Sequence, residues 1–345
     1  MEKNLEKSLK RFLKRKVKIT LGFIVAFLLS CNFIWAEGIE ITQGDNGEIL
    51  FNGEVYNPET HQFAGNTFDG KTYTNYSQLE GISFSENLQE EINFVNKNQF
   101  LGEIYNLSNN LSNIENQGLV KNSLYDGTAT IINEKNIKNI VNDGVISIEN
   151  ATGSAFLIYN LGGKIDNIRN SGFLYSSALG ICNINSYIDK IENSGLYFNE
   201  IYSEYVSPTQ FPEYPDRFEN SIVKEIENKG EIFKFSDESS AYAIQLSGSE
   251  PVYDSPNVEN QKIINKGKIM GITTAEKFPS SAIMINGSSS KFEDLDNSGL
   301  LYSSEKNYSR PYATVSDILN VKNEGVIAKV VLGTGKGRVS KILKL

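Results

Sequence analysis

Apolar and polar residues follow one repeated order through the last two-thirds of the chain. The order is an apolar residue, any residue, asparagine, any residue and glycine, followed by further apolar residues. Eight copies occur, with asparagines 26, 28, 23, 35, 37, 32 and 26 residues apart, which is the length range of one solenoid coil. The repeated pairs are Asn116 and Gly118, Asn142 and Gly144, Asn170 and Gly172, Asn193 and Gly195, Asn228 and Gly230, Asn265 and Gly267, Asn297 and Gly299, and Asn323 and Gly325.

The copy that starts at Ile165 illustrates the expected coil. Apolar residues three apart, then Asn170 and Gly172, then Phe173 and Leu174 predict a short strand, a tight corner and a second strand. We expect Gly172 to allow a positive φ at the corner. Asn170 is expected to satisfy corner backbone groups and to stack on the equivalent asparagines as an amide ladder.

A second phrase, Ser-Ala followed by apolar residues, includes Ala155, Ala178, Ala241 and Ala282. The next repeat asparagine follows 15 residues later for three of them and 24 residues later for Ala241. This pattern predicts two strands per coil, with length variation confined to projecting loops. A helical repeat is the alternative, but the many Gly, Asn and β-branched residues disfavour it.

The predicted fold is all-β, a right-handed parallel β-helix with an N-terminal cap. Residues 89–345 would form the repeats, with Phe94 to Asn98 as a degenerate first coil in which Asn98 fills the glycine position. Residues 37–88 carry short strand-like pieces and would cap the stack. Eight coils at one strand spacing each would give a rod of roughly 40 Å.

Residues 1–36 are typical of an export signal. Residues 1–20 carry eight Lys and Arg against two Glu, a net charge of +6, and an apolar run to Ala36 follows. We expect cleavage after Ala36. An uncleaved signal anchor is an alternative, although the apolar run is shorter than the roughly 20 residues of a membrane span. Lipidation at Cys31, which follows Leu-Leu-Ser, is another.

Removing residues 1–36 takes the formal charge from −9 to −15, because that segment carries +6. This acidic remainder argues against nucleic acid as a partner. Only Cys182 would remain, so an intramolecular disulfide is excluded.

The segment from Asn4 to Gly22, NLEKSLKRFLKRKVKITLG, resembles the extended signal region of autotransporters, the type V secreted proteins, of fusobacteria and their relatives. The resemblance implies a passenger, commonly a parallel β-helix, that a C-terminal β-barrel carries across the outer membrane. The C-terminal residues do not follow the barrel pattern of strands of roughly ten alternating residues. The chain is therefore expected to be a passenger whose translocator barrel is supplied separately or lost, or to be exported by another route.

Catalytic chemistry has little support in the sequence. His61 is the only histidine, and no serine motif near it resembles a protease triad. Asp166, Asp189, Glu225 and Glu293 precede repeat asparagines and would form an acidic row, whereas glycoside hydrolysis needs a matched pair of carboxylates. We expect no cofactor and no metal.

Two insertions rich in tyrosine and proline are the candidate ligand contacts. Rings on a backbone stiffened by proline bury contact area at a small cost in entropy. Packing of these rings onto the rod is the competing interpretation. The candidate contact residues are Tyr202, Tyr205, Phe211, Tyr214, Tyr308, Arg310 and Tyr312.

These features predict a secreted or surface-displayed passenger that acts as an adhesin or interaction rod without catalytic activity. Its partner would be a host-cell or matrix protein or a glycan. The alternatives are a polysaccharide-active β-helix enzyme, a truncated non-functional remnant, and a periplasmic location.

Overall fold

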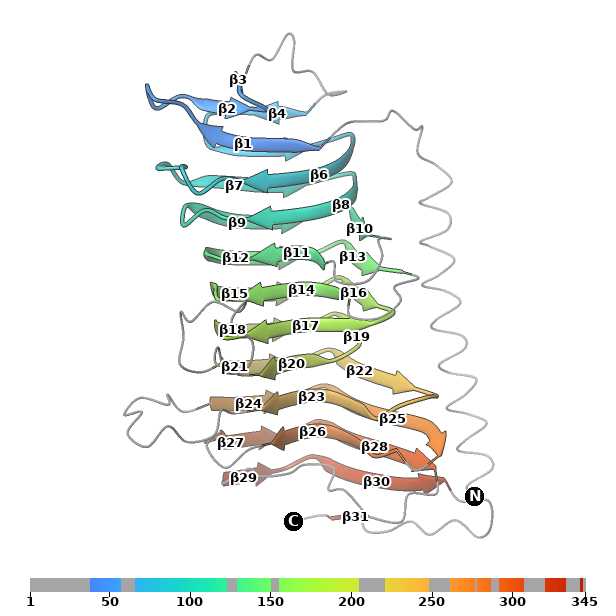
Figure 1. The fold of residues 1–345 in the computed structure, drawn as a ribbon. Coiled ribbons are helices and arrows are strands. Elements are labelled where there is room, and N and C mark those ends of the chain that lie inside the picture. Colours follow the sequence, from blue (N-terminus) through green and yellow to red (C-terminus); the bar gives the residue numbers. More distant parts are fainter. Residues whose placement is uncertain are drawn as a thin grey trace, which may run out of the picture.

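The computed structural model describes residues 38–56, 66–122, 129–149, 155–204, 221–247, 261–276, 278–286, 292–306, 320–332 and 342–343. The regular elements within these ranges are all β-strands. Most of them pair in parallel with the equivalent strand one coil away, so the strands stack into an elongated rod (Figure 1). The predicted all-β parallel β-helix is confirmed.

The first strand of each coil belongs to one sheet, which we call the ladder sheet. Each of these strands ends on an asparagine. Equivalent asparagines pair in register, as Asn142 does with Asn116 and Asn170. The strands are β5 (Thr72–Asn75), β7 (Ile92–Asn96), β9 (Leu111–Asn116), β12 (Asn136–Asn142), β15 (Lys164–Asn170), β18 (Tyr187–Asn193), β21 (Ile222–Asn228), β24 (Gln261–Asn265), β27 (Phe292–Asn297) and β29 (Asn320–Asn323).

The remaining strands of the coils form a second sheet, the bent sheet, which turns a corner between two strand positions. Two early strands, β6 (Gln78–Phe84) and β8 (Gln99–Asn106), run across both positions. The second strands are β10 (Leu119–Asn122), β13 (Val145–Ile148), β16 (Phe173–Ser176), β19 (Leu196–Phe198), β22 (Glu231–Ser236), β25 (Lys268–Glu276), β28 (Leu300–Lys306) and β30 (Val326–Leu332). The third strands are β11 (Ala129–Asn133), β14 (Phe156–Leu161), β17 (Leu179–Ile184), β20 (Ile201–Glu204), β23 (Ala241–Ser247) and β26 (Ser280–Asn286).

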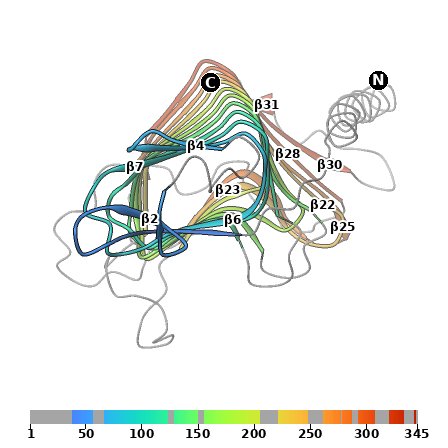
Figure 2. The ribbon, with the colours of Figure 1, turned by 90° about the horizontal axis from the view of Figure 1, so that it is seen from above.

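A coil of the middle of the rod therefore has three strands, not the two that the sequence pattern predicted. The Ser-Ala phrases lie at the start of third strands, and Ala155, Ala241 and Ala282 are fully buried there. Seen along its axis, the rod has a roughly triangular outline (Figure 2). The two repeated phrases mark the ladder strand and the third strand, whereas the second strand begins directly after the repeat glycine and has no phrase of its own.

The core is a column of stacked aliphatic side chains. Residues two positions before the repeat asparagines pair in register from coil to coil, and six consecutive coils place isoleucine there. Each isoleucine is at most 3% exposed, and burial stabilises the fold by about 1.5–3 kcal/mol per side chain. The six residues are Ile114, Ile140, Ile168, Ile191, Ile226 and Ile263.

The N-terminal end of the rod is closed by antiparallel strands. β1 (Ile39–Gln43) pairs in parallel with β6 and antiparallel with β2 (Ile49–Phe51), which pairs with β3 (Glu54–Val55). β4 (Thr67–Phe68) pairs antiparallel with β5. The parallel coils begin with β5 and β6, inside the range 37–88 that the sequence assigned to a cap.

Ten coils from β5 to β29, each one strand spacing apart, give a rod of about 45 Å. The last described coil has two exposed valines at positions that are buried or half-buried in the earlier coils, and among the described strands no parallel strand packs on its far side. Val321 is 44% exposed and Val326 is 40% exposed. At this end β30 pairs antiparallel with β31 (Ile342–Leu343).

Candidate functional site

The repeat asparagines form one continuous amide ladder inside the rod. The Nδ2 of each asparagine donates to the Oδ1 of the next at 2.6–2.8 Å. The ladder extends beyond the eight predicted asparagines, because Asn75 and Asn96 continue it at the N-terminal end. Each amide also donates to backbone carbonyl groups, as Asn142 does to Gly144 and Phe173 at 3.3 and 3.2 Å. The asparagine phrase therefore has a structural role in every coil.

The repeat glycines are needed for close packing between coils, not for a positive φ. The described glycines with positive φ are Gly47, Gly53, Gly70 and Gly162, so this part of the prediction was wrong. A Cβ on a repeat glycine would instead lie 2.0–2.2 Å from a backbone oxygen of the neighbouring coil. Asn98 occupies the equivalent place in the second coil, since Leu119 N–H donates to its carbonyl oxygen at 2.8 Å.

A second buried amide ladder runs along the end of the third strands. Asn106, Asn133, Asn160 and Asn183 are joined in that order by Nδ2 to Oδ1 bonds of 2.8 Å, and Asn183 then donates to Ser203 Oγ at 3.1 Å. The sequence analysis missed this ladder. Its signal was the spacing of 27, 27 and 23 residues, which is close to that of the first ladder, but no glycine phrase accompanies it.

The predicted acidic residues do not line up as one row on the ladder sheet, because Glu225 is the register partner of Lys190 and lies one position beyond Asp189. Asp166 pairs with Lys164 at 2.7 Å and Asp189 with Lys224 at 3.5 Å. Glu225 pairs with Lys190 at 3.1 Å. Glu293 lies in β27. The described members of this set, Asp166, Asp189 and Glu225, lie in ion pairs with lysines and offer no matched pair of free carboxylates.

Glu227 is the centre of the strongest charge cluster on the ladder sheet. Its carboxylate lies 2.9 Å from Lys229 Nζ, 3.1 Å from Lys266 Nζ and 3.4 Å from Lys190 Nζ. The hydrogen bond from Lys229, followed by that from Lys266, lowers the pKa of Glu227 to about 2 although partial burial opposes the shift. This carboxylate is charged throughout the physiological range and ties three coils together.

Among the candidate contact residues, Tyr202 is placed by the structure. It lies in β20, half-buried on the outer side of the strand, with Cys182 and Gln245 as its register partners. Tyr197 and Phe198, from the same tyrosine-rich stretch, pack on the rod, with Tyr197 1% exposed. Tyr205, Phe211, Tyr214, Tyr308, Arg310, Tyr312 and also His61 lie outside the described residues.

The described strands fix where two long internal connections begin and end. Segment 205–220 follows Glu204 at the end of β20, and segment 248–260 follows Ser247 at the end of β23. Glu204 and Ser247 are register partners in neighbouring coils. Both connections lead into strands of the ladder sheet, so they leave and rejoin the rod at one corner.

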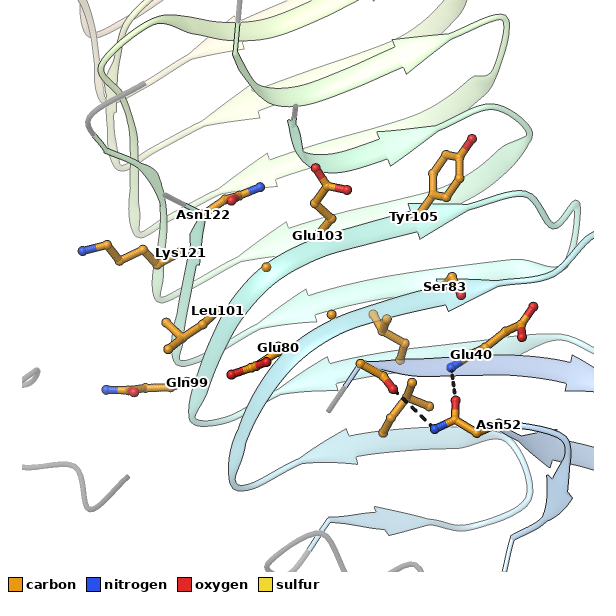
Figure 3. Close-up of a pocket in the computed structure, with 15 residues that line it drawn as sticks. Glu40, Asn52, Glu80, Ser83, Gln99, Leu101, Glu103, Tyr105, Lys121 and Asn122 are labelled. Atoms are coloured by element: carbon orange, nitrogen blue, oxygen red, sulfur yellow. Dashed lines mark hydrogen bonds between the residues drawn. The ribbon is translucent and has the colours of Figure 1, made fainter. Parts of the chain in front are cut away.

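A groove of about 790 Å³ crosses the outer face of the bent sheet near the N-terminal end (Figure 3). Gly81 and Gly102 belong to its floor, and Glu80, Glu103 and Tyr105 are among the side chains that line it. Burial raises the pKa of Glu103, while a backbone hydrogen bond from Ala129 opposes the shift.

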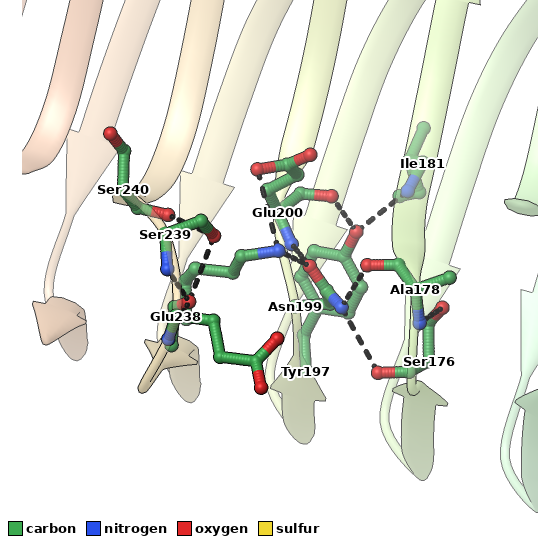
Figure 4. Close-up of polar contacts among 11 residues, drawn as sticks. Ser176, Ala178, Ile181, Tyr197, Asn199, Glu200, Glu238, Ser239 and Ser240 are labelled. Carbon is green, nitrogen blue, oxygen red and sulfur yellow. Dashed lines mark hydrogen bonds and ion pairs between the residues drawn. The ribbon is translucent and has the colours of Figure 1, made fainter. Parts of the chain in front are cut away.

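A polar cluster occupies the corner between β19 and β20 (Figure 4). Tyr197 Oη accepts from Ile181 N–H at 2.7 Å and donates to the carbonyl oxygen of Glu200. Lys234 Nζ lies 2.6 Å from Asn199 Oδ1 and 3.6 Å from a carboxylate oxygen of Glu200. Burial raises the pKa of Glu200, while the nearby Lys234 opposes the shift. Ile181 and Lys234 are far in sequence from Tyr197, Asn199 and Glu200 and reach them because neighbouring coils stack.

Within the described ranges, no cluster of three or more His, Cys, Asp or Glu side chains is arranged to hold a metal ion. No helix among the described elements is long and apolar enough to cross a membrane. Comparison of this chain with protein-family models, with curated proteins and with solved structures found no match.

Proposed function

We propose that this chain is a secreted or surface-displayed interaction rod, an autotransporter-type passenger that acts as an adhesin without catalysing a reaction. The observation that carries the proposal is the common corner from which segments 205–220 and 248–260 leave the coil stack. Connections held by a rigid scaffold are where binding residues concentrate in proteins. Tyr205, Phe211 and Tyr214 belong to the first of these segments.

The rod would supply reach and the connecting segments would supply contacts. Strand ends one coil apart are separated by about 5 Å, so both segments could touch one ligand. Tyrosine rings suit contact with a host-cell or matrix protein or a glycan, because they bury a large area with few rotatable bonds. The acidic surface disfavours nucleic acid. A translocator barrel supplied separately would be the partner in export.

Binding of the purified chain to host cells and to matrix-coated surfaces tests the proposal. The test variant replaces Tyr205, Tyr214, Tyr308 and Tyr312 by serine, and the matched control is Tyr76→Ser, which alters an exposed tyrosine in the first coil. We expect at least a tenfold loss of affinity in the test variant and none in the control. Equal binding by all three proteins would contradict the adhesin proposal.

Protease treatment of intact producing cells tests the location. Release of peptides from the coil region without lysis would support display outside the cell. Their release only after lysis would contradict surface display and favour the periplasm.

The groove in Figure 3 favours one second candidate, a polysaccharide-active enzyme. Glycoside hydrolysis uses a protonated carboxylic acid and a second carboxylate, and the groove is lined by Glu40, Glu80 and Glu103. Release of new reducing ends from host glycans, abolished by Glu103→Gln, would support this candidate. Activity that persists in Glu103→Gln would assign the hydrolysis elsewhere.

A further inference from the structure

Asn199 and Lys234 are held side by side by the stacking of two coils. Asn199 lies between β19 and β20, and Lys234 lies in β22 of the next coil. The backbone N–H of Asn199 donates to the carbonyl oxygen of Phe233 at 2.9 Å. This backbone bond fixes the position of Asn199 beside the strand that carries Lys234.

The carboxamide of Asn199 has one defined orientation. Its Nδ2 donates to the carbonyl oxygens of Ser176 and Ala178 at 3.0 and 2.7 Å, and its Oδ1 accepts from Glu200 N–H at 2.8 Å. The opposite orientation would point an NH₂ group at the N–H of Glu200 and at Lys234 Nζ. Asn199 adopts a φ of 124°, a strained value for a residue other than glycine, to place its side chain there.

Lys234 Nζ approaches the carbonyl side of this amide at 2.6 Å from Oδ1. Cγ, the electrophilic carbon of the amide, is the atom bonded to this Oδ1. A carboxylate oxygen of Glu200 lies 3.6 Å from the same Nζ. An amine, an oriented amide and a carboxylate therefore meet at one point.

We propose that Lys234 and Asn199 form an intramolecular isopeptide bond, with Glu200 as the acceptor of the ammonium proton. Glu200 accepts a proton from the ammonium group, and the freed Nζ lone pair forms a bond to Asn199 Cγ. A second proton passes from Nζ to Nδ2, the bond between Cγ and Nδ2 breaks, and ammonia leaves. The products are a secondary amide, ammonia and Glu200 in its protonated form. No atom is oxidised or reduced.

The surroundings favour this reaction. Asn199 is 3% exposed, and the side chains of Glu200 and Lys234 are 11% and 12% exposed. Phe233, which precedes Lys234 in the chain, is 7% exposed, and the low exposure of the reacting groups limits the access of water as a competing nucleophile. The Glu200 N–H that binds Oδ1 would stabilise the oxyanion of the tetrahedral intermediate. Burial raises the pKa of Glu200, which makes its carboxylate a better proton acceptor.

The bond would be a covalent link between neighbouring coils across the connection that contains segment 205–220. Such a link constrains the unfolded chain in the same way as a disulfide. Cys182 is the one cysteine among the described residues, so the described coils contain no disulfide between them that does this. The inference does not depend on the ligand or on the location of the protein.

Peptide mapping of the folded full-length chain by mass spectrometry is the decisive experiment. We expect a branched tryptic peptide that joins the Asn199 and Lys234 peptides, with the mass of both less one ammonia. Lys234→Arg, which keeps the charge, should abolish the branch, and Glu200→Gln should reduce its yield at least tenfold. The matched control is Lys121→Arg, because Lys121 Nζ is similarly half-buried and lies 2.8 Å from Glu149.

Two results would overturn the proposal. One is recovery of the Asn199 and Lys234 peptides unlinked from folded wild-type protein, a result that requires no variant to fold. The other is an ammonia loss confined to the Asn199 peptide that persists in Lys234→Arg, because this would identify cyclisation of the asparagine onto its own backbone. Wild-type yield of the branch in Glu200→Gln would overturn the role of Glu200.

Discussion

Gly172 lies so close above Gly144 that a Cβ on Gly172 would be 2.1 Å from the carbonyl oxygen of Gly144. That oxygen also accepts a hydrogen bond from Phe173 N–H at 2.9 Å, so it cannot move away without breaking the pairing between coils. The neighbouring repeat glycines show the same close approach. Stacking of the corners therefore selects glycine at this point of every coil.

Gly172→Ala should lower the free energy of unfolding by about 3 kcal/mol, because the added methyl group must push two coils apart. The matched control is Gly81→Ala, where the added Cβ would lie 3.6 Å from the nearest atom, an ordinary contact. We expect the control to change stability by less than about 0.5 kcal/mol. Urea unfolding followed by circular dichroism would measure both. Similar midpoints for the two variants would refute the packing explanation.

Asn170→Ala should be more destabilising than the same change at the end of the ladder. Asn170 accepts from Asn142 at 2.8 Å and donates to Asn193 at 2.7 Å, so alanine leaves a buried donor and a buried acceptor each short of a partner. We expect a loss of about 2–4 kcal/mol. At the end of the ladder, Asn323 accepts from Asn297 at 2.6 Å and lies in a partly exposed coil, so Asn323→Ala should cost about 1 kcal/mol.

Comparison of these two variants by urea unfolding would show whether the ladder acts through burial. Equal losses at the two positions would mean that burial of the amides does not determine their contribution.

The sequence was sufficient to predict the parallel β-helix and the asparagine ladder because both depend on a local phrase repeated at coil spacing. It was insufficient where the phrase changes. The phrase requires glycine two positions after asparagine, but Ser77 stands two positions after Asn75, so the first coil was assigned to a cap. The second ladder was missed because Asn133 and Asn160 are followed by different turns.

Contacts between coils could not be predicted residue by residue. Asn199 and Lys234 are 35 positions apart, and their meeting depends on the register between β19 and β22. That register follows from stacking of the whole coil, so it has no local signal. The prediction of a positive φ at the repeat glycines was wrong for a related cause. The sequence of one corner is compatible with a positive φ, whereas the contact that excludes a Cβ comes from the neighbouring coil.

Glu227 should make the stability of the rod sensitive to acid. Its pKa is about 2 in the folded chain because of Lys229 and Lys266, against about 4.3 in an unfolded chain. A carboxylate with a lowered pKa contributes its full stability above the unfolded value and loses it as the pH falls from about 5 to 2. Glu227→Gln should therefore destabilise the protein by about 2 kcal/mol at pH 7 and have almost no effect near pH 2.

Unfolding measured across this pH range, with Glu324→Gln as the control, would test the prediction for Glu227. The pair of Glu324 with Lys322 is 3.3 Å long and well exposed, and such pairs contribute less than about 1 kcal/mol. If the free energies of unfolding of wild type and Glu227→Gln differed by the same amount from pH 7 to pH 2, the predicted acid sensitivity would be contradicted.

Tyr197→Phe should destabilise the corner between β19 and β20 although it removes a single oxygen atom. The hydroxyl group is fully buried, accepts from Ile181 N–H at 2.7 Å and donates to the carbonyl oxygen of Glu200. Phenylalanine would remove one of the two partners of each backbone group, because Ile181 N–H also donates to the carbonyl oxygen of Glu200 at 3.1 Å, and we expect a cost of about 1 kcal/mol. Tyr175→Phe is the matched control, because the centroid of its half-buried ring lies 5.4 Å from that of Phe198 and the substitution preserves that contact.

Urea unfolding should separate the two variants, and faster hydrogen exchange at the amide of Ile181 in Tyr197→Phe would locate the loss at this bond. Unchanged exchange at Ile181 would show that the hydroxyl group does not protect the corner.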